Sequence, residues 1–371
     1  MTKIRGIYVH IPFCTGKCAY CDFYSVKANE AVRDKYVEAL TTEIISARDL
    51  VSFAPADTLY IGGGTPSTLS PGQIERIVAA VSLNYRFEPR EVTMECNPDP
   101  GLDIKAIKNV GINRLSMGVQ SLSDIVLAKA GRRHTAREAL EALEKARKYF
   151  DNLSADIMIG LPGESTSDAI DTLRLVAPLV DHISVYMLTL EKGTKLYKSV
   201  SEKTVTLPDD DSVADRYDMA VELLGKFGFS RYEISNFARP GRFSKHNMKY
   251  WQREEYLGFG AAAHGFADGK RYSNPASVSR YVSGENFGSG KVVPGPVSVS
   301  DAMAETVMLA LRTSEGLDVK KFEREFGVDF ADHYSEAIAK TSRMTEFTPE
   351  KLVVRPEFML FESAVAREFM G

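Results

Sequence analysis

The stretch Tyr8-Val-His-Ile-Pro-Phe-Cys14-Thr-Gly-Lys-Cys18-Ala-Tyr-Cys21-Asp-Phe23 holds three of the chain's four cysteines, spaced C-x3-C-x2-C. Residues 4–9 predict a short strand, and Pro12 and Gly16 place the thiols after it in a loop. Thiolates are soft ligands that suit zinc or iron–sulfur centres. Structural zinc usually has four ligands, and a cubane cluster usually has four cysteines. Three cysteines would leave one iron of such a cluster open to a small molecule; free or zinc-bound thiols are the alternative.

The composition is that of a sizeable globular protein. The chain has 371 residues, of which 44% are hydrophobic, and a net charge of −4, so we expect a large core and two domains. No basic block indicates nucleic acid as a partner, and no run of 18 apolar residues predicts a transmembrane segment. The start of the chain lacks the apolar region of a signal peptide. Together with the clustered cysteines, this predicts a cytoplasmic protein.

Strand and helix patterns alternate along the first half of the chain. Apolar strand patterns recur at residues 57–61, 91–95, 113–117, 153–159 and 182–188, and amphipathic helices separate them. Such alternation predicts parallel βαβ units in an α/β fold. The spacing of the strands is close to that of a (β/α) barrel, and a doubly wound open sheet is the alternative.

Three regions follow from the changes in pattern. Residues 1–230 contain the βαβ units. Residues 231–298 are rich in Gly, Ser, Pro and aromatic side chains and are predicted to be loop-rich, apart from a short strand near 231–234. Residues 299–371 predict helices followed by a small β element, as in a winged-helix-like α+β domain.

Polar or glycine-rich residues fall where five consecutive strands end. They are the cysteine loop, the turn Gly62-Gly63-Gly64-Thr65-Pro66, Glu95, Gln120 and Asp156. In a parallel barrel these strand ends meet at one face, where ligands bind. Each feature alone is weak, because a triple glycine is more often a tight turn and a lone carboxylate is more often a helix cap. Their coincidence predicts a binding site.

The cysteine spacing resembles the signature of the radical S-adenosylmethionine (SAM) superfamily, and the six units resemble its partial (β/α)6 TIM-like barrel. That resemblance implies a [4Fe–4S] cluster on Cys14, Cys18 and Cys21, with SAM chelating the open iron. Further motifs resemble oxygen-independent coproporphyrinogen III oxidases and their relatives: Gly62-Gly-Gly-Thr-Pro-Ser67, Glu95-x-Asn97-Pro98, Gly118-Val-Gln120-Ser121, Gly131-Arg132-x-His134 and Asp156-x-Met-x-Gly-Leu-Pro-Gly163. In that family the matching residues contact SAM: Tyr8, Tyr20, Gly63, Gly64, Thr65, Glu95, Gln120, Arg132 and Asp156.

Two departures from those oxidases are informative. The oxidases have a fourth cysteine two positions after the third, where this chain has Phe23, and a longer segment before the residue that matches Tyr8. The pattern C-x3-C-x2-C-x-F with few preceding residues is similar instead to HemW-type haem chaperones. A further mark of these proteins is H-N-x-x-Y-W, present here as His246-Asn-Met-Lys-Tyr250-Trp251.

The H-N-x-x-Y-W motif is a candidate haem site. A neutral imidazole of His246 could ligate haem iron, and Tyr250 and Trp251 could stack on the macrocycle. The alternative is a loop anchor in which His246 is hydrogen-bonded and Trp251 is buried. His264, in a glycine-rich segment, is a second candidate ligand.

The sequence therefore predicts a haem chaperone that binds haem and a SAM-chelated [4Fe–4S] cluster and delivers haem to haem-dependent proteins, including membrane-bound respiratory ones. A homodimer is compatible with this reading. The alternative is an enzyme, an oxygen-independent coproporphyrinogen III oxidase that converts two propionates to vinyl groups by radical decarboxylation. The barrel motifs support that chemistry, whereas Phe23 and the few residues before Tyr8 argue against that substrate. Radical chemistry on another tetrapyrrole is a third option.

Overall fold

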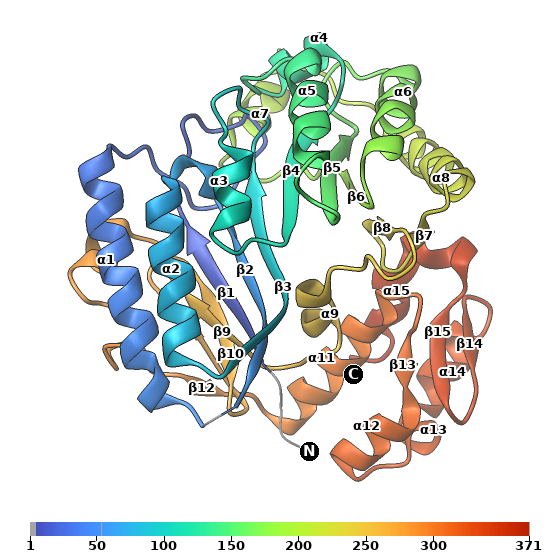
Figure 1. The fold of residues 1–371 in the computed structure, drawn as a ribbon. Helices are drawn as coiled ribbons and strands as arrows, with labels where there is room; N and C mark the ends of the chain where they lie inside the picture. The colour runs from blue at the N-terminus through green and yellow to red at the C-terminus, as the bar shows by residue number, and fades with distance from the viewer. Residues whose placement is uncertain (1–4, 53, 371) are drawn as a thin grey trace.

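The computed structural model describes residues 5–52 and 54–370 and contains one large sheet and one small sheet (Figure 1). The predicted first residue of the first strand, Ile4, lies outside these ranges. Six parallel strands follow one another across the large sheet in chain order: β1 (Arg5–Ile11), β2 (Ala56–Gly63), β3 (Phe87–Cys96), β4 (Arg114–Gln120), β5 (Leu153–Ile159) and β6 (His182–Met187). A doubly wound sheet would reverse its order partway, which these strands do not do. The predicted partial (β/α)6 barrel is confirmed.

Helices cover the outer face of the six strands: α1 (Glu30–Ala47), α2 (Pro71–Asn84), α3 (Ile104–Asn109), α5 (Ala136–Arg147), α6 (Thr166–Val176) and α8 (Asp210–Lys226) (Figure 1). Local sequence fixes where several of them begin. Ser70, Thr135 and Ser165 each form a capping box with the side chain three residues further on. Buried apolar residues of the strands and helices then form one continuous core beneath the face at which the strands end.

The segment 231–298 is more regular than the sequence predicts. Strand β9 (Tyr256–Phe259) pairs in parallel with β1, and β10 (His264–Ala267), β11 (Lys270–Ser273) and β12 (Gly295–Pro296) continue the sheet beyond it. On the other side β8 (Asn236–Ala238) and β7 (Ser230–Arg231) extend the sheet past β6, and the short strand expected at 231–234 overlaps β7 at Arg231 alone. These strands are too short to show a clear alternating pattern. They are stabilised by pairing with neighbouring strands rather than by local propensity, so the sequence alone does not indicate them.

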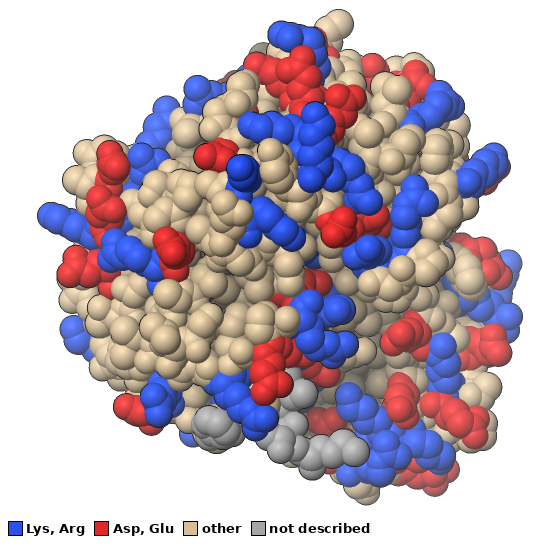
Figure 2. Space-filling model, viewed as in Figure 1, with Lys and Arg blue, Asp and Glu red and all other residues tan. Residues whose placement is uncertain are grey.

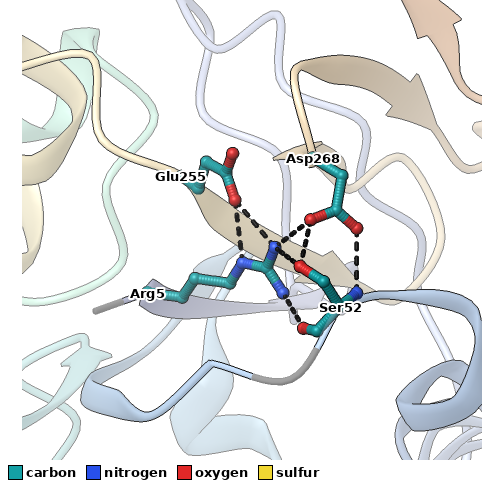
Figure 3. A network of polar contacts seen from close by, with 4 residues as sticks. All are labelled: Arg5, Ser52, Glu255 and Asp268. Atoms are coloured by element: carbon teal, nitrogen blue, oxygen red, sulfur yellow. Dashed lines mark hydrogen bonds and ion pairs between the residues drawn. The ribbon is translucent and has the colours of Figure 1, made fainter. Parts of the chain in front are cut away.

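A buried arginine fastens this extension to the barrel at the N-terminal end of β1 (Figure 3). Arg5 donates to Glu255, just before β9, at 2.8 and 2.9 Å, and to Asp268, in the turn between β10 and β11, at 2.6 Å. It also donates to the backbone oxygen of Ser52 at 2.7 Å. Four chain segments therefore meet at one guanidinium, on the side of the barrel opposite the strand ends.

Residues after 298 form the smaller C-terminal domain (Figure 1). Its antiparallel sheet has the order β13 (Leu317–Asp318), β15 (Lys351–Val354), β14 (Thr345–Phe347). Its helices are α11 (Val299–Leu311), α12 (Val319–Phe326), α13 (Phe330–His333), α14 (Ser335–Thr341) and α15 (Glu362–Arg367). They enclose an apolar core separate from that of the barrel. The smaller C-terminal α+β domain that the sequence predicts is confirmed.

Charged residues of both signs are mixed on the face of the molecule drawn in Figure 2. Ion pairs also join neighbouring elements, such as exposed Arg147 with buried Asp181. Among the described residues, no helix has both the length and the apolar character needed to cross a bilayer.

Candidate functional site

Backbone hydrogen bonds hold the cysteine loop at its two ends and near its middle. Its two ends are joined by backbone hydrogen bonds from Cys14 to Val26 (3.1 Å) and from Val26 to Pro12 (2.8 Å). Near its middle, the N–H of Ala19 donates to Ala130, after helix α4 (Asp124–Lys129), at 3.0 Å. The carbonyl of Ala19 accepts from Leu196, in helix α7 (Lys195–Ser201), at 2.8 Å. The loop is therefore held from both sides of the barrel mouth.

A cavity of about 500 Å³ opens at the ends of the barrel strands, where the sequence predicts the binding site. Most of the predicted residues line it: Cys14, Cys18, Tyr20, Cys21, Gly63, Gly64, Thr65, Glu95, Gln120, Arg132 and Asp156. Tyr8 is not among the lining residues; its hydroxyl instead lies 2.9 Å from Nδ1 of His10. Ten of these positions come from strand ends or the loops after them, as parallel barrel geometry requires. Arg132 joins them from the loop after α4.

The glycine turn after β2 packs directly against the start of the cysteine loop. Gly64 and Thr65 donate backbone hydrogen bonds to Ile11 (2.8 Å) and Phe13 (2.7 Å). Gly63 has a φ of +110°, and a Cβ at Gly64 would lie 2.8 Å from the carbonyl oxygen of Phe13. Only glycine fits there, so the turn brings its backbone close to any ligand in the cavity.

Two carboxylates, Glu95 and Asp156, line the cavity together with the thiols and are half-buried. Glu95 accepts hydrogen bonds from the hydroxyl of Tyr60 (2.7 Å) and the N–H of Gly63 (3.0 Å). Desolvation nevertheless raises the pKa of Glu95 to about 7, and it also raises the pKa of Asp156. Glu95 can therefore change protonation near neutral pH.

Sequence reasoning missed Asn97 as a site residue, although it stands in the quoted motif. Asn97 follows β3 directly, and its side chain contacts both Thr65 and Arg132. Arg132, expected to hold a carboxylate of SAM, already donates to Cys18 Sγ (3.4 Å), Asn97 Oδ1 (2.8 Å) and the Gly118 carbonyl (2.6 Å). The one feature of the sequence that could have indicated Asn97 is that it is a polar residue immediately after strand β3.

The mouth of the cavity contains further residues that the sequence did not single out. Tyr186, Met187 and Glu191 come from the end of β6 and the segment that leads to α7. Phe23 also lines the cavity, and it is 67% exposed. Cys96 is buried and lines the same cavity.

The H-N-x-x-Y-W motif forms helix α9 (Lys245–Trp251), outside this cavity. His246 is fully buried, with Nδ1 2.9 Å from Thr58 Oγ1 and Nε2 2.8 Å from the hydroxyl of Tyr250. Burial lowers the pKa of His246 to about 3, so the imidazole is neutral. Both ring nitrogens have partners, which is the arrangement of the anchor alternative. Ligation of haem iron by His246 would require one of these contacts to break.

Trp251 lies in a different place from His246 and Tyr250. It lines a cavity of about 220 Å³ between α9 and the C-terminal domain, and the guanidinium of Arg312 stands 5.0 Å from the centre of its ring. The three candidate haem residues therefore do not face one common space.

Helix α9 is fixed at its start by a buried carboxylate of β3. Glu91 accepts hydrogen bonds from the backbone N–H groups of Lys245 (2.9 Å) and His246 (3.2 Å). The same carboxylate attracts the guanidinium of Arg114, which is also buried. A negative charge at a helix N-terminus is favourable, so Glu91 holds the motif against the barrel.

The thiols have the chemistry of iron–sulfur ligands, since thiolates are soft donors. A cubane cluster holds its iron atoms at separate corners, so its thiolates stand apart around a shared space. Cys14, Cys18 and Cys21 line one cavity in this way, and each lacks a disulfide partner. The residues present therefore fit a cluster with one open iron.

Comparisons with known proteins agree with this geometry. The model of the radical SAM superfamily matches residues 8–176, and that of the HemN C-terminal domain matches residues 297–344. Heme chaperone HemW of Lactococcus lactis is 36% identical over 95% of this chain and 92% of its own length. Heme chaperone HemW of Bacillus subtilis is 34% identical over 87% of each chain. The structure of Escherichia coli coproporphyrinogen III oxidase HemN, 22% identical, superimposes with a TM-score of 0.85 over 99% of this chain and 90% of that chain, which shows a common fold.

Proposed function

The chain belongs to the HemW family of the radical SAM superfamily, and we propose that it binds haem and passes it to haem-requiring proteins. The observation that carries the proposal is the identity to heme chaperones over nearly the whole chain, together with the three-cysteine cavity. The recipients would include membrane-bound respiratory proteins, and the chaperone would act in the cytoplasm, as a monomer or a homodimer. In this proposal, the cofactors bind to residues 1–230. The H-N-x-x-Y-W motif is anchored within residues 231–298, and the C-terminal domain is formed by residues 299–371.

Membership of the superfamily implies a [4Fe–4S] cluster and SAM, and the cavity offers a group for each part of them. The thiolates of Cys14, Cys18 and Cys21 would hold the cluster, which supplies single electrons when bound. The backbone of the glycine turn would hold the amino group of SAM. Glu95, Gln120 and Asp156 would accept hydrogen bonds from its ammonium or ribose groups. Tyr8 and Tyr20 would contribute aromatic surface near the loop.

Binding of SAM is expected to depend on pH through Glu95. Its carboxyl has a pKa of about 7 without a ligand, and only the ionised form accepts hydrogen bonds on both oxygens. The apparent affinity of reconstituted protein for SAM should therefore rise about tenfold between pH 6 and pH 8. Isothermal titration across this range measures it. In Glu95→Gln the dependence should flatten to that of SAM's own amino group; an unchanged slope would remove Glu95 from the site.

We place the haem at the mouth of the cavity rather than at His246. Phe23 (67% exposed) and Tyr186 (40% exposed) both line the cavity, and Met187 follows Tyr186 in the chain. Exposed aromatic side chains that line a cavity indicate a partner, and a flat macrocycle stacks on such rings. Lys17, which is exposed and lines the same cavity, is a cation suited to a propionate.

The experiment that tests the function is a haem titration of anaerobically reconstituted protein, paired with an assay for protoporphyrinogen formation from coproporphyrinogen III. A stoichiometric Soret band without decarboxylation supports the chaperone. Decarboxylation supports the oxidase. If the protein shows no Soret band and no decarboxylation, both functions are overturned.

A second titration locates the haem. Phe23→Ser should weaken binding by about tenfold or more, because burying a phenylalanine contributes about 1.5–3 kcal/mol, whereas folded His246→Asn should bind as the wild type does. The reverse result would assign the haem to His246.

A further inference from the structure

Each of the three cysteines has a hydrogen-bond donor beside its sulfur. The hydroxyl of Thr65 lies 3.4 Å from Cys14 Sγ, and Nη1 of Arg132 lies 3.4 Å from Cys18 Sγ. The third, Cys21, has the backbone N–H of Phe23 as its donor. The first two donors are side chains from different parts of the barrel, the β2 turn and the loop after α4. A further residue is needed to keep the side chains of Thr65 and Arg132 directed at the two sulfur atoms together.

Asn97 joins these two donors. Its Nδ2 lies 3.3 Å from Thr65 Oγ1, and its Oδ1 lies 2.8 Å from Nη2 of Arg132. An arginine has only N–H donors, so the oxygen of the amide must face Arg132 and the NH2 group must face Thr65. The hydroxyl oxygen of Thr65 then accepts from Asn97 and keeps its proton for another acceptor. When Cys14 is ionised to bind metal, its sulfur has no proton, so Thr65 must be the donor in that contact.

Arg132 retains capacity for a ligand in addition to these contacts. Of its five N–H groups, two on Nη2 are used by Asn97 and the Gly118 carbonyl, and one on Nη1 is used by Cys18. Its Nε is buried and has no partner within the described residues. The contact to Cys18 and a contact to SAM are therefore compatible.

We propose that Asn97 is a positioning residue that sets the reduction potential of the cluster by aiming Thr65 at Cys14 and Arg132 at Cys18. Hydrogen bonds to the sulfurs of a cluster tune its potential. Donors to thiolate, above all a charged guanidinium, stabilise negative charge. The reduced cluster has one negative charge more than the oxidised cluster, so the donors favour reduction and their loss should make the potential more negative. The inference rests on the cluster of the proposed function and is independent of haem.

The test is an anaerobic potentiometric titration of reconstituted protein without SAM, followed by electron paramagnetic resonance of the reduced cluster. Asn97→Leu should bind as much iron and sulfide as the wild type. At the wild-type midpoint, its ratio of reduced to oxidised cluster should fall at least tenfold, which corresponds to about 59 mV for one electron. Asn109→Leu is the matched control, because Asn109 is exposed on α3 and far from the network in sequence.

Thr65 variants keep the inference testable if Asn97→Leu does not assemble a cluster. Thr65→Val removes only the hydroxyl and should shift the potential in the same direction, by a smaller amount, whereas Thr65→Ser should restore the wild-type value. Fully loaded Asn97→Leu or Thr65→Val with an unchanged potential would overturn the role of Asn97. Failure of the wild type itself to bind a [4Fe–4S] cluster would instead contradict the proposed function.

Discussion

Replacement of Cys18 by serine is expected to empty the cavity of its cluster, lowering bound iron from about four atoms to less than one per chain. A serine hydroxyl stays protonated near neutral pH and is a hard ligand, so it does not replace a thiolate on iron. Two remaining thiolates cannot hold a cubane whose fourth corner is already without a protein ligand. The same loss is expected for Cys14→Ser and Cys21→Ser. Iron and acid-labile sulfide analysis after anaerobic reconstitution measures it.

The remaining cysteine provides the control for this experiment. Cys96 is buried in the wall of the same cavity, outside the cysteine loop. Cys96→Ala should retain the full complement of iron, because a buried thiol of this kind behaves as a small hydrophobic side chain. If Cys18→Ser bound the full amount of iron, or if only Cys96→Ala lost iron, the assignment of Cys14, Cys18 and Cys21 as the cluster ligands would be wrong. Zinc in place of iron in the wild type would contradict the cluster altogether.

Removal of the Glu91 carboxylate should destabilise the protein strongly. Glu91→Ala leaves the buried guanidinium of Arg114 without a nearby opposite charge and the first N–H groups of α9 without an acceptor. Leaving a buried polar group unsatisfied costs about 1–3 kcal/mol for each group. The chain's single tryptophan, Trp251, is on α9, so its fluorescence during urea unfolding follows this helix directly.

A second glutamate on the same strand serves as the matched control. Glu88 is also in β3, but its side chain is 74% exposed and pairs only with exposed Arg86. Glu88→Ala should change the free energy of unfolding by less than about 0.5 kcal/mol. Equal midpoints for the Glu91→Ala variant and the wild type would show that α9 does not depend on this carboxylate.

The barrel and most of its cavity could be predicted from sequence because both depend on local signals. Strand ends such as Glu95 and Gln120 were located by hydrophobic pattern, and parallel strands must bring their ends together. The glycine turn could be predicted as well, since a side chain at Gly63 would collide with His10 of β1 and a side chain at Gly64 would collide with the backbone of Ile11 and Phe13. The assignment of SAM contacts to these residues came from family resemblance and stays a prediction.

The features that sequence did not predict depend on contacts between distant segments. Strands β9 to β11 are each four residues long, and the pairing of β9 with β1, of β10 with β9 and of β11 with β10 leaves no periodic trace. His246 could have been a ligand or an anchor, because the difference lies in Thr58, a residue 188 positions away. Asn97 was quoted as part of a motif, but its partners Thr65 and Arg132 become neighbours only when the barrel closes.

The backbone contacts of Ala19 have a consequence for what a variant without the cluster keeps. Ala130 and Leu196 bind the loop through peptide groups, so these two contacts need no metal, and we expect them to survive in Cys18→Ser. Amide hydrogen exchange at Ala19 and Leu196 should then be as slow in that variant as in the wild type.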